Sequence, residues 1–149
     1  MTITFILFIF ISLTFSAFFS GMEIAFISAN KLKIELDNKK GEWNAKILSF
    51  FSKKPAWFIA SMLIGNNVAL VIYSLYMADL IYPILHNVGF SNTLILLFQT
   101  IFSTFFILIF AEFLPKAIFR LNPNTVLKVF SIALVILYFI LWPITFLVV

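Results

Sequence analysis

The sequence predicts an all-α integral membrane protein. Of its 149 residues, 63% are hydrophobic and only 11% are charged, and the mean hydropathy is +1.13. Soluble globular domains are about half apolar and about a quarter charged, so this chain cannot cover itself with polar surface as a water-soluble monomer. Four long apolar runs, each near the roughly 20 residues that cross a bilayer core, indicate where its helices lie.

The first three runs are predicted to span the membrane. Met1–Met22 carries no charged side chain. It lacks the basic start and small-residue cleavage site of a signal peptide, so we interpret it as a retained span. Pro55–Ala78 is the second run, and Thr93–Ala111 is the third. A turn-rich segment, His86–Asn92, separates them.

The fourth run, Val129–Val149, has two interpretations. Hydropathy alone makes it another span, whereas an apolar helix lying along the inner face fits equally well. Pro143 would kink or end the helix in either case. The sequence stops at this apolar run without a polar tail, and we expect it to be the membrane part of a longer protein.

The positive charge is concentrated in one loop and predicts the orientation. Residues 31–54 contain seven lysines against three acidic residues, which accounts for the whole net charge of +4. Cytoplasmic loops collect Lys and Arg, so we expect this loop and Lys116–Lys128 inside the cell. The N-terminus and His86–Asn92 are then outside. Nucleic-acid binding is not expected, because long apolar runs flank the basic loop.

The chemistry available to the chain is narrow. It has no Cys and a single His, His86. Disulfides, thiolate metal sites and cysteine nucleophiles are excluded, and an imidazole-based zinc or copper site is not expected. His86 lies in a predicted outer loop, away from the serines of the first span. We therefore expect no enzymatic activity.

The first span carries a polar stripe. Its members recur at steps of four, four and three residues, which stacks them on one helical face: Ser12, Ser16, Ser20 and Glu23. Single serines in helices usually bond back to a carbonyl one turn earlier, and a lone Glu at a span end can reach interfacial water. Gly21, inside the stripe, is expected to loosen the helix and expose carbonyls.

The second span contains Gly65, Asn66 and Asn67 in the middle of its apolar run. One Asn is explained as an interhelical hydrogen-bonding residue. Two beside a Gly suggest a local opening with amide oxygens directed inward. For Ser61 and Gly65, one turn apart, we favour close helix packing.

The third span ends in the segment Ala111-Glu-Phe-Leu-Pro-Lys116. Pro115 has no N–H and is expected to free the Ala111 carbonyl beside the Glu112 carboxylate. Lys116 follows Glu112 at i+4, a spacing that suits an ion pair. This pair is either part of a site or a helix-end salt bridge.

Together, the three spans offer hydroxyl, amide, carboxylate and carbonyl oxygens without sulfur or imidazole. Hard oxygen donors suit Mg²⁺, Ca²⁺ or Na⁺ rather than soft transition metals. Ionisable groups at membrane depth are expensive and generally functional. The pattern therefore predicts a cation-handling membrane protein.

Three motifs in this order resemble the transmembrane domain of the CNNM/CorC family. They are residues 13–28, Ile64-Gly-Asn-Asn67, and Ala111–Lys116 with Asn122-Pro123. Members are known as magnesium transporters or efflux proteins, some with haemolysin-like names. Met22 stands where many relatives have Ser or Thr.

The resemblance implies a homodimer in a cell (inner or plasma) membrane. Each subunit would have three transmembrane helices, a cytoplasmic helical hairpin and an apolar juxtamembrane helix. These elements would cover about 3–28, 55–79 and 93–114 for the spans, 31–54 for the hairpin and 124–149 for the juxtamembrane helix. It also implies a following pair of cytoplasmic CBS modules, which lies outside this sequence.

The resemblance also implies a function and a site. The family binds dehydrated Mg²⁺ between its helices, and its motifs match here at Ser16, Ser20, Asn66 and Glu112, with Gly21, Glu23 and Asn67 nearby. We expect Mg²⁺ efflux by alternating access, coupled to Na⁺ entry and permitted by breaks at Gly21, Gly65 and Pro115. The alternatives are a scaffold or Mg²⁺-sensing docking protein that moves no ions, and a channel.

Overall fold

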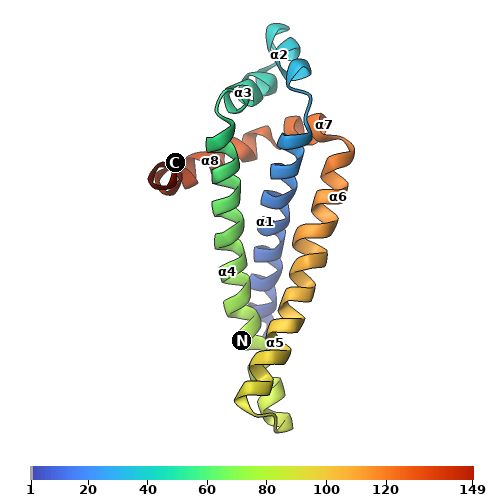
Figure 1. Ribbon diagram of the computed structural model, residues 1–149, viewed down its shortest axis with the longest axis vertical. Helices are drawn as coiled ribbons and strands as arrows, with labels where there is room; N and C mark the ends of the chain where they lie inside the picture. The colour runs from blue at the N-terminus through green and yellow to red at the C-terminus, as the bar shows by residue number, and fades with distance from the viewer. Residues whose placement is uncertain (1) are drawn as a thin grey trace.

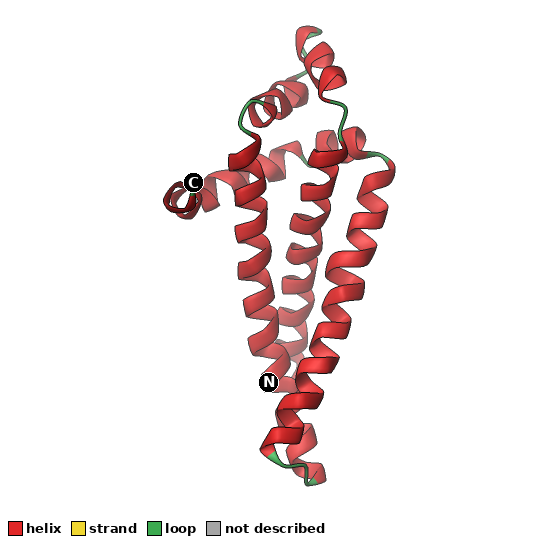
Figure 2. Cartoon of the chain, in the orientation of Figure 1, coloured by secondary structure: helices red, strands yellow, loops and turns green. Residues whose placement is uncertain are grey.

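A computed structural model describes residues 2–149, which fold almost entirely into helices joined by short loops (Figure 2). No strand occurs within this range. The elements in chain order are α1 (Thr2–Ser28), α2 (Lys31–Lys39), α3 (Trp43–Ser52), α4 (Pro55–Val88), α5 (Asn92–Phe106), the π-helix η1 (Ile107–Phe113), α6 (Leu114–Leu121), α7 (Pro123–Val129) and α8 (Ser131–Val148).

Three long helical columns run side by side along the molecule: α1, α4 and the continuous α5–η1–α6 (Figure 1). They are long and apolar enough to cross a membrane, with 27, 34 and 30 residues respectively. At about 1.5 Å per residue even the shortest is about 40 Å long, more than the roughly 30 Å hydrocarbon core. The helical membrane class predicted from composition is confirmed.

The helix α8 is a fourth candidate span by length and composition, one more than the three predicted. It does not run along the columns but crosses them, at the end of the molecule where α2 and α3 lie (Figure 1). It packs onto α3 and α4: the buried Tyr138 contacts Phe51, and the more exposed Trp142 stacks with Trp57. Pro143 lies inside α8 and does not end it.

The second column is longer than the predicted span. We expected the span to end near residue 79 and a turn-rich break from His86, but α4 continues to Val88. Pro83 lies within it. The helix ends at Gly89, whose φ of 99° is a left-handed conformation that glycine adopts without steric cost. Of the predicted break His86–Asn92, only the part from Gly89 onward lies outside α4.

The helices α2 and α3 form a hairpin at the end opposite the α4–α5 turn (Figure 1). They cover most of the basic segment between residues 31 and 54 and are joined at Gly41, with a φ of 89°. The base of the hairpin is an aromatic cluster in which Phe58 stacks with Phe26 at 4.2 Å and contacts Phe51 at 5.1 Å between ring centroids. Burial of these rings fixes α3 against the bundle.

The outer part of the hairpin is attached to α7 by charged and polar side chains. The Lys128 ammonium donates to the Asp37 carboxylate and, at 3.1 Å, to Glu42 Oε2. Asn30 and Asn124 exchange two hydrogen bonds: Asn30 N–H to Asn124 Oδ1 at 2.9 Å, and Asn124 Nδ2 to the Asn30 carbonyl at 3.2 Å. We call these contacts the hairpin latch.

The hairpin latch is expected to open when its ammonium is removed. The hydrogen bond from Lys128 holds the pKa of the Asp37 carboxyl below its ordinary value of 3.8. A lowered carboxyl pKa means that the contact stabilises the fold above that value and is lost only as pH falls through the lowered pKa. In the Lys128→Met variant, amide hydrogen exchange in α2 should be faster at neutral pH than in the wild type.

The matched control for this measurement is Lys46→Met, which removes an exposed lysine of the same hairpin. Exchange in α2 should then stay at the wild-type rate. Equal exchange in the Lys128→Met variant and the wild type would contradict the assignment of the latch.

Candidate cation site

Two serines of the predicted stripe point from α1 into the bundle. Ser16 and Ser20 are 0% and 1% exposed. The Ser16 hydroxyl donates to Asn66 Oδ1 at 2.5 Å, and the Ser20 hydroxyl donates to Glu112 Oε1 at 3.3 Å. Ser12, one turn earlier, bonds back to the Phe8 carbonyl at 2.7 Å instead, the usual behaviour of a helical serine.

On α4, only the first of the two asparagines faces the other columns. Asn66 is buried and links two partners: its Oδ1 accepts from Ser16, and its Nδ2 donates to Glu112 Oε1 at 3.5 Å. Asn67, the next residue, is exposed and lies outside this network. Adjacent residues differ by about 100° around a helix, so the two amides cannot face the same point.

The third column contributes Glu112 through an irregular helix. Glu112 lies in η1, where the Leu114 N–H bonds to the Ile109 carbonyl five residues back. We expected Pro115 to free a single carbonyl. Instead, the hydrogen-bond pattern widens to five-residue steps over the seven residues Ile107–Phe113, which end two positions before Pro115. The Glu112 side chain is 28% exposed.

The structure thus joins Ser16, Ser20, Asn66 and Glu112, from three columns, into one hydrogen-bonded group that we call the polar cluster. Ser20 lies eight residues before the end of α1 and Asn66 eleven residues after the start of α4. These separations correspond to about 12 and 17 Å along the helices. The cluster therefore lies inside the helical columns rather than at their ends, close to where the uncharged runs Met1–Met22 and Thr93–Ala111 stop.

Glu112 carries its own counter-charge. The Lys116 ammonium lies 3.0 Å from Glu112 Oε2, whereas Ser20 and Asn66 donate to the other carboxylate oxygen, Oε1. This is the predicted i+4 ion pair. Among residues 2–149 no group of three or more His, Cys, Asp or Glu side chains is placed to hold a metal ion, and Glu112 is the carboxylate that the hydrogen bonds of the cluster include.

The glycines next to the cluster serve packing, contrary to the breaks we expected. Both α1 and α4 continue without interruption through Gly21 and Gly65. A Cβ atom on Gly21 would lie 2.1 Å from the Phe119 ring, and one on Gly65 would lie 2.6 Å from the Phe19 ring. Each glycine makes room for an aromatic ring of a neighbouring helix. For Ser61 and Gly65 the packing interpretation agrees with these contacts, since Ser61 also contacts Thr145 at 3.0 Å.

Glu23, the last member of the predicted stripe, is half-buried on α1. It takes no part in the hydrogen bonds that join the polar cluster. Glu23 shares the helical face of Ser16, but it lies three residues, or about 4.5 Å, further along α1 than Ser20, so its distance from the cluster is along the helix axis rather than around it. Of the three secondary candidates, Gly21 is a packing residue, while Glu23 and Asn67 lie outside the cluster.

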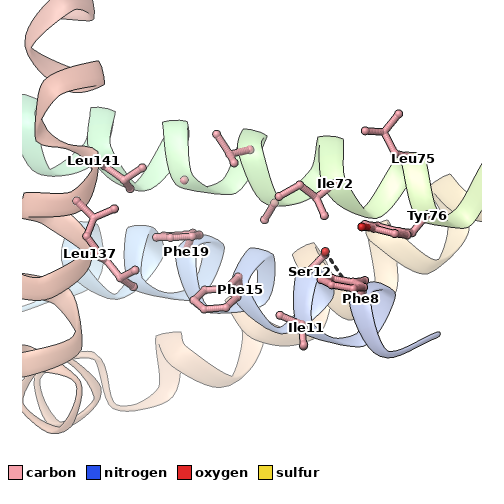
Figure 3. A pocket seen from close by; sticks show the side chains of 14 residues that line it. Phe8, Ile11, Ser12, Phe15, Phe19, Ile72, Leu75, Tyr76, Leu137 and Leu141 are labelled. Atoms are coloured by element: carbon pink, nitrogen blue, oxygen red, sulfur yellow. Dashed lines mark hydrogen bonds between the residues drawn. The ribbon is translucent and has the colours of Figure 1, made fainter. Parts of the chain in front are cut away.

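A groove on the surface of α1, α4 and α8 is separate from the polar cluster. It has a volume of about 510 Å³ and is lined by apolar side chains apart from Ser12 and the Tyr76 hydroxyl. Figure 3 shows Phe15 and Phe19 from α1, Ile72 from α4 and Leu137 from α8 around it. Ser12 is satisfied by its own helix, so the groove offers little to a hydrated ion.

Sequence reasoning missed Tyr73 and Phe119. Tyr73 is fully buried and donates to the Ser103 carbonyl at 3.1 Å, which ties α4 to α5 four residues before η1. A lone Tyr in an apolar run is a weak signal, because many such residues lie at the lipid interface. Phe119 had no signal at all, since it is one of 21 phenylalanines.

The family assignment comes from the whole length of the bundle. A model of the cyclin M (CNNM) transmembrane N-terminal domain matches residues 6–149, which include the polar cluster and all of the three columns except the start of α1. The chain belongs to the CNNM family. The membrane domain predicted from its three motifs is therefore confirmed.

Relatives of this CNNM domain are bacterial proteins several times its length. The UPF0053 inner membrane protein YfjD of Escherichia coli is 30% identical over 89% of this chain and 29% of its own length. The UPF0053 protein MG146 homolog of Mycoplasma pneumoniae is 27% identical over 87% of this chain and 31% of its own length. The chain thus spans about a third of these relatives. With its apolar columns, these matches make it a multi-pass membrane protein.

The donor set of the polar cluster fits a small hard cation. It consists of two hydroxyl oxygens, an amide oxygen and a carboxylate, with neither sulfur nor imidazole. Mg²⁺ and Ca²⁺ prefer such oxygen ligands. Binding requires the hydroxyls to present lone pairs to the ion rather than hydrogens to Asn66 and Glu112, a rotation about a single bond.

Proposed function

We propose that this CNNM domain binds Mg²⁺ at the polar cluster and exports it in exchange for Na⁺. One observation carries the proposal: oxygen-bearing side chains from three separate columns converge on one carboxylate inside the helical bundle. If the polar residues served only their own helix, as Ser12 does, side chains from three helices would not have to meet at one point. Polar groups inside membranes are costly and generally mark ion pathways.

Oxygen spacing in the cluster suits Mg²⁺. The pairs Ser16 Oγ–Asn66 Oδ1 and Ser20 Oγ–Glu112 Oε1 are separated by 2.5 and 3.3 Å. An octahedron with metal–oxygen distances of about 2.0–2.1 Å has edges of about 3 Å, so these pairs could form two of its edges after small shifts. Carbonyls or water would complete the six ligands. The larger Ca²⁺ would need wider separations.

The orientation that we propose places the hairpin in the cytoplasm and the N-terminus outside. The seven lysines in residues 31–54 support this orientation, because basic residues are retained on the cytoplasmic side of a membrane. In this orientation α8 is a juxtamembrane helix along the inner face. Its crosswise direction in Figure 1 supports that assignment.

Export needs an energy source. Moving a divalent cation outward against an inside-negative potential costs about 4.6 kcal/mol per 100 mV. Binding at Glu112 cannot supply this, since a ligand only shifts the balance between states. We propose Na⁺ entry as the source and alternating access as the cycle. The irregular η1 segment, rather than Gly21 or Gly65, is the element next to the cluster that is suited to rearrange.

The test is flux into or out of liposomes containing the purified protein. We expect Mg²⁺ movement that depends on an opposing Na⁺ gradient and is lost in both Glu112→Ala and Asn66→Ala variants. In cells preloaded with Mg²⁺, both variants should retain the ion. Unchanged efflux in both variants would remove the polar cluster from the mechanism.

A second candidate function is a scaffold that senses Mg²⁺ without moving it. It is favoured by one observation, that each side chain of the cluster already has a hydrogen-bond partner within the protein and so can act as interhelical adhesive. In liposomes a scaffold would bind Mg²⁺ at most, and show no flux. A channel would conduct Mg²⁺ without Na⁺ dependence.

Two partners complete the proposal. We propose a homodimer in the membrane and cytoplasmic CBS modules in the same polypeptide. The chain covers 29–34% of its relatives, which leaves ample length for further domains in proteins of this kind. Crosslinking in membranes and the mass of the detergent-solubilised protein test the dimer.

A further inference from the structure

The Lys116–Glu112 pair occupies the carboxylate that the proposed function assigns to Mg²⁺. Lys116 Nζ lies 3.0 Å from Glu112 Oε2, while Oε1 accepts from Ser20 and Asn66. The ammonium is the cationic partner of Glu112, and the other two donors are neutral. Any cation that binds Glu112 must therefore share the carboxylate with Lys116 or replace it.

Sharing is unfavourable. Lys116 follows Glu112 by one helical turn, so a divalent ion on the carboxylate would lie within several ångströms of the ammonium. Like charges at this separation repel strongly in a partly buried environment, where screening is weak. An empty carboxylate without a counter-ion is also costly at this depth. If Mg²⁺ and the Lys116 ammonium replace each other on Glu112, the carboxylate is neither shared by two cations nor left unpaired.

The position of Lys116 allows it to withdraw. Its side chain is 39% exposed, more than the 28% of Glu112, and it lies five residues before the end of α6. That distance is about 8 Å along the helix, and a lysine can extend its flexible stem toward the interface while its charge stays hydrated. Arg cannot do the same as easily, because its planar group favours fixed two-point contacts.

We infer that Lys116 is a built-in counter-cation that competes with Mg²⁺ for Glu112. It leaves the carboxylate when Mg²⁺ binds and returns when Mg²⁺ is released. This inference rests on the proposed function, because it names how that site is regulated. It makes Lys116 a residue that lowers Mg²⁺ affinity and speeds release, rather than a ligand.

The experiment measures Mg²⁺ binding by titration calorimetry to the full chain in lipid nanodiscs. The Lys116→Met variant keeps most of the apolar stem and removes the charge, and we expect its Mg²⁺ affinity to rise about tenfold or more. Lys116→Arg should bind within a few-fold of the wild type. In liposomes the Lys116→Met variant should show a lower KM for Mg²⁺ together with a lower maximal rate, because release becomes slower.

The matched control is Arg120→Met, which removes a positive charge one turn further from Glu112 on the same helix. Its affinity should stay close to the wild-type value, which separates direct competition from general electrostatics. Lys116→Gln provides a second neutral side chain if the methionine variant does not fold. Melting temperatures in the absence of Mg²⁺ check folding.

The outcomes separate the two proposals. If the wild-type protein binds no Mg²⁺, the proposed function fails and this inference fails with it. If the wild type binds Mg²⁺ but the neutral variants bind it equally or more weakly, the function stands and the competition is overturned. Tighter binding by Lys116→Arg would also overturn it, because the charge is still present.

Discussion

Changing Glu112 to Gln is expected to weaken Mg²⁺ binding on the order of 100-fold and to abolish efflux. Mg²⁺ is held in proteins through one or two carboxylates, and the polar cluster has one. Charge-assisted interactions contribute about 1.5–3 kcal/mol each, and every 1.4 kcal/mol is a factor of ten in affinity. Mg²⁺ titration of the purified protein and flux in liposomes measure the two effects.

Folding should survive this substitution. Gln has nearly the shape of Glu, and its carbonyl oxygen can still accept from Ser20 and Asn66. The loss is therefore assigned to charge and not to packing. The matched control is Asp79→Asn, the same chemical change on an exposed face of α4, which should leave both binding and flux at wild-type values. Retained flux in the Glu112→Gln protein would contradict the assigned site.

The side chains of the polar cluster were predicted from the motifs that the chain shares with the CNNM/CorC family, and helical geometry accounts for part of their arrangement. Ser16 and Ser20 are one helical turn apart, so any helix places them on one face, and burial then brings them to a neighbour. The ion pair of Glu112 and Lys116 likewise depends only on i+4 spacing. Predictions of this kind succeed because they depend on local helical geometry, which the apolar run guarantees.

Features that depend on packing between helices were not predictable. Helical periodicity does not distinguish Asn66 from Asn67; the family resemblance favoured Asn66, and the rotation of α4 in the bundle is what makes it face Ser16. The π-helix before Pro115 is one of several ways to accommodate a missing N–H, so proline alone does not specify it. The aromatic rings that pack against Gly21 and Gly65 are more than forty residues away in the chain, so local sequence does not reveal them.

Gly21→Ala is expected to destabilise the bundle although it improves helix propensity. Alanine is favoured over glycine in a helix interior by about 1 kcal/mol, so propensity alone predicts a more stable protein. The new Cβ, however, would lie 2.1 Å from Phe119 Cδ2 and 2.8 Å from its Cγ, too close to the root of the ring for a small adjustment. Overpacking of this kind typically costs about 1–3 kcal/mol.

The same clash should impair the site. Gly21 follows Ser20 directly, and Phe119 lies three residues after Lys116 on α6. Separation of α6 from α1 therefore moves Glu112 away from the Ser20 hydroxyl, a contact that is already 3.3 Å long. We expect the Gly21→Ala protein to melt at a lower temperature and to bind Mg²⁺ more weakly.

A second substitution tests the cause. Phe119→Ala removes the ring atoms that the new methyl group would meet, so the double variant should lose less melting temperature than the sum of the losses in the two single variants. Two variants that interact through one contact are non-additive in this way, whereas independent effects would sum. Additive losses, or a Gly21→Ala protein that melts above the wild type, would show that α1 and α6 are not packed through Gly21. Other contacts between the third column and α1 would then have to hold Glu112 near Ser20.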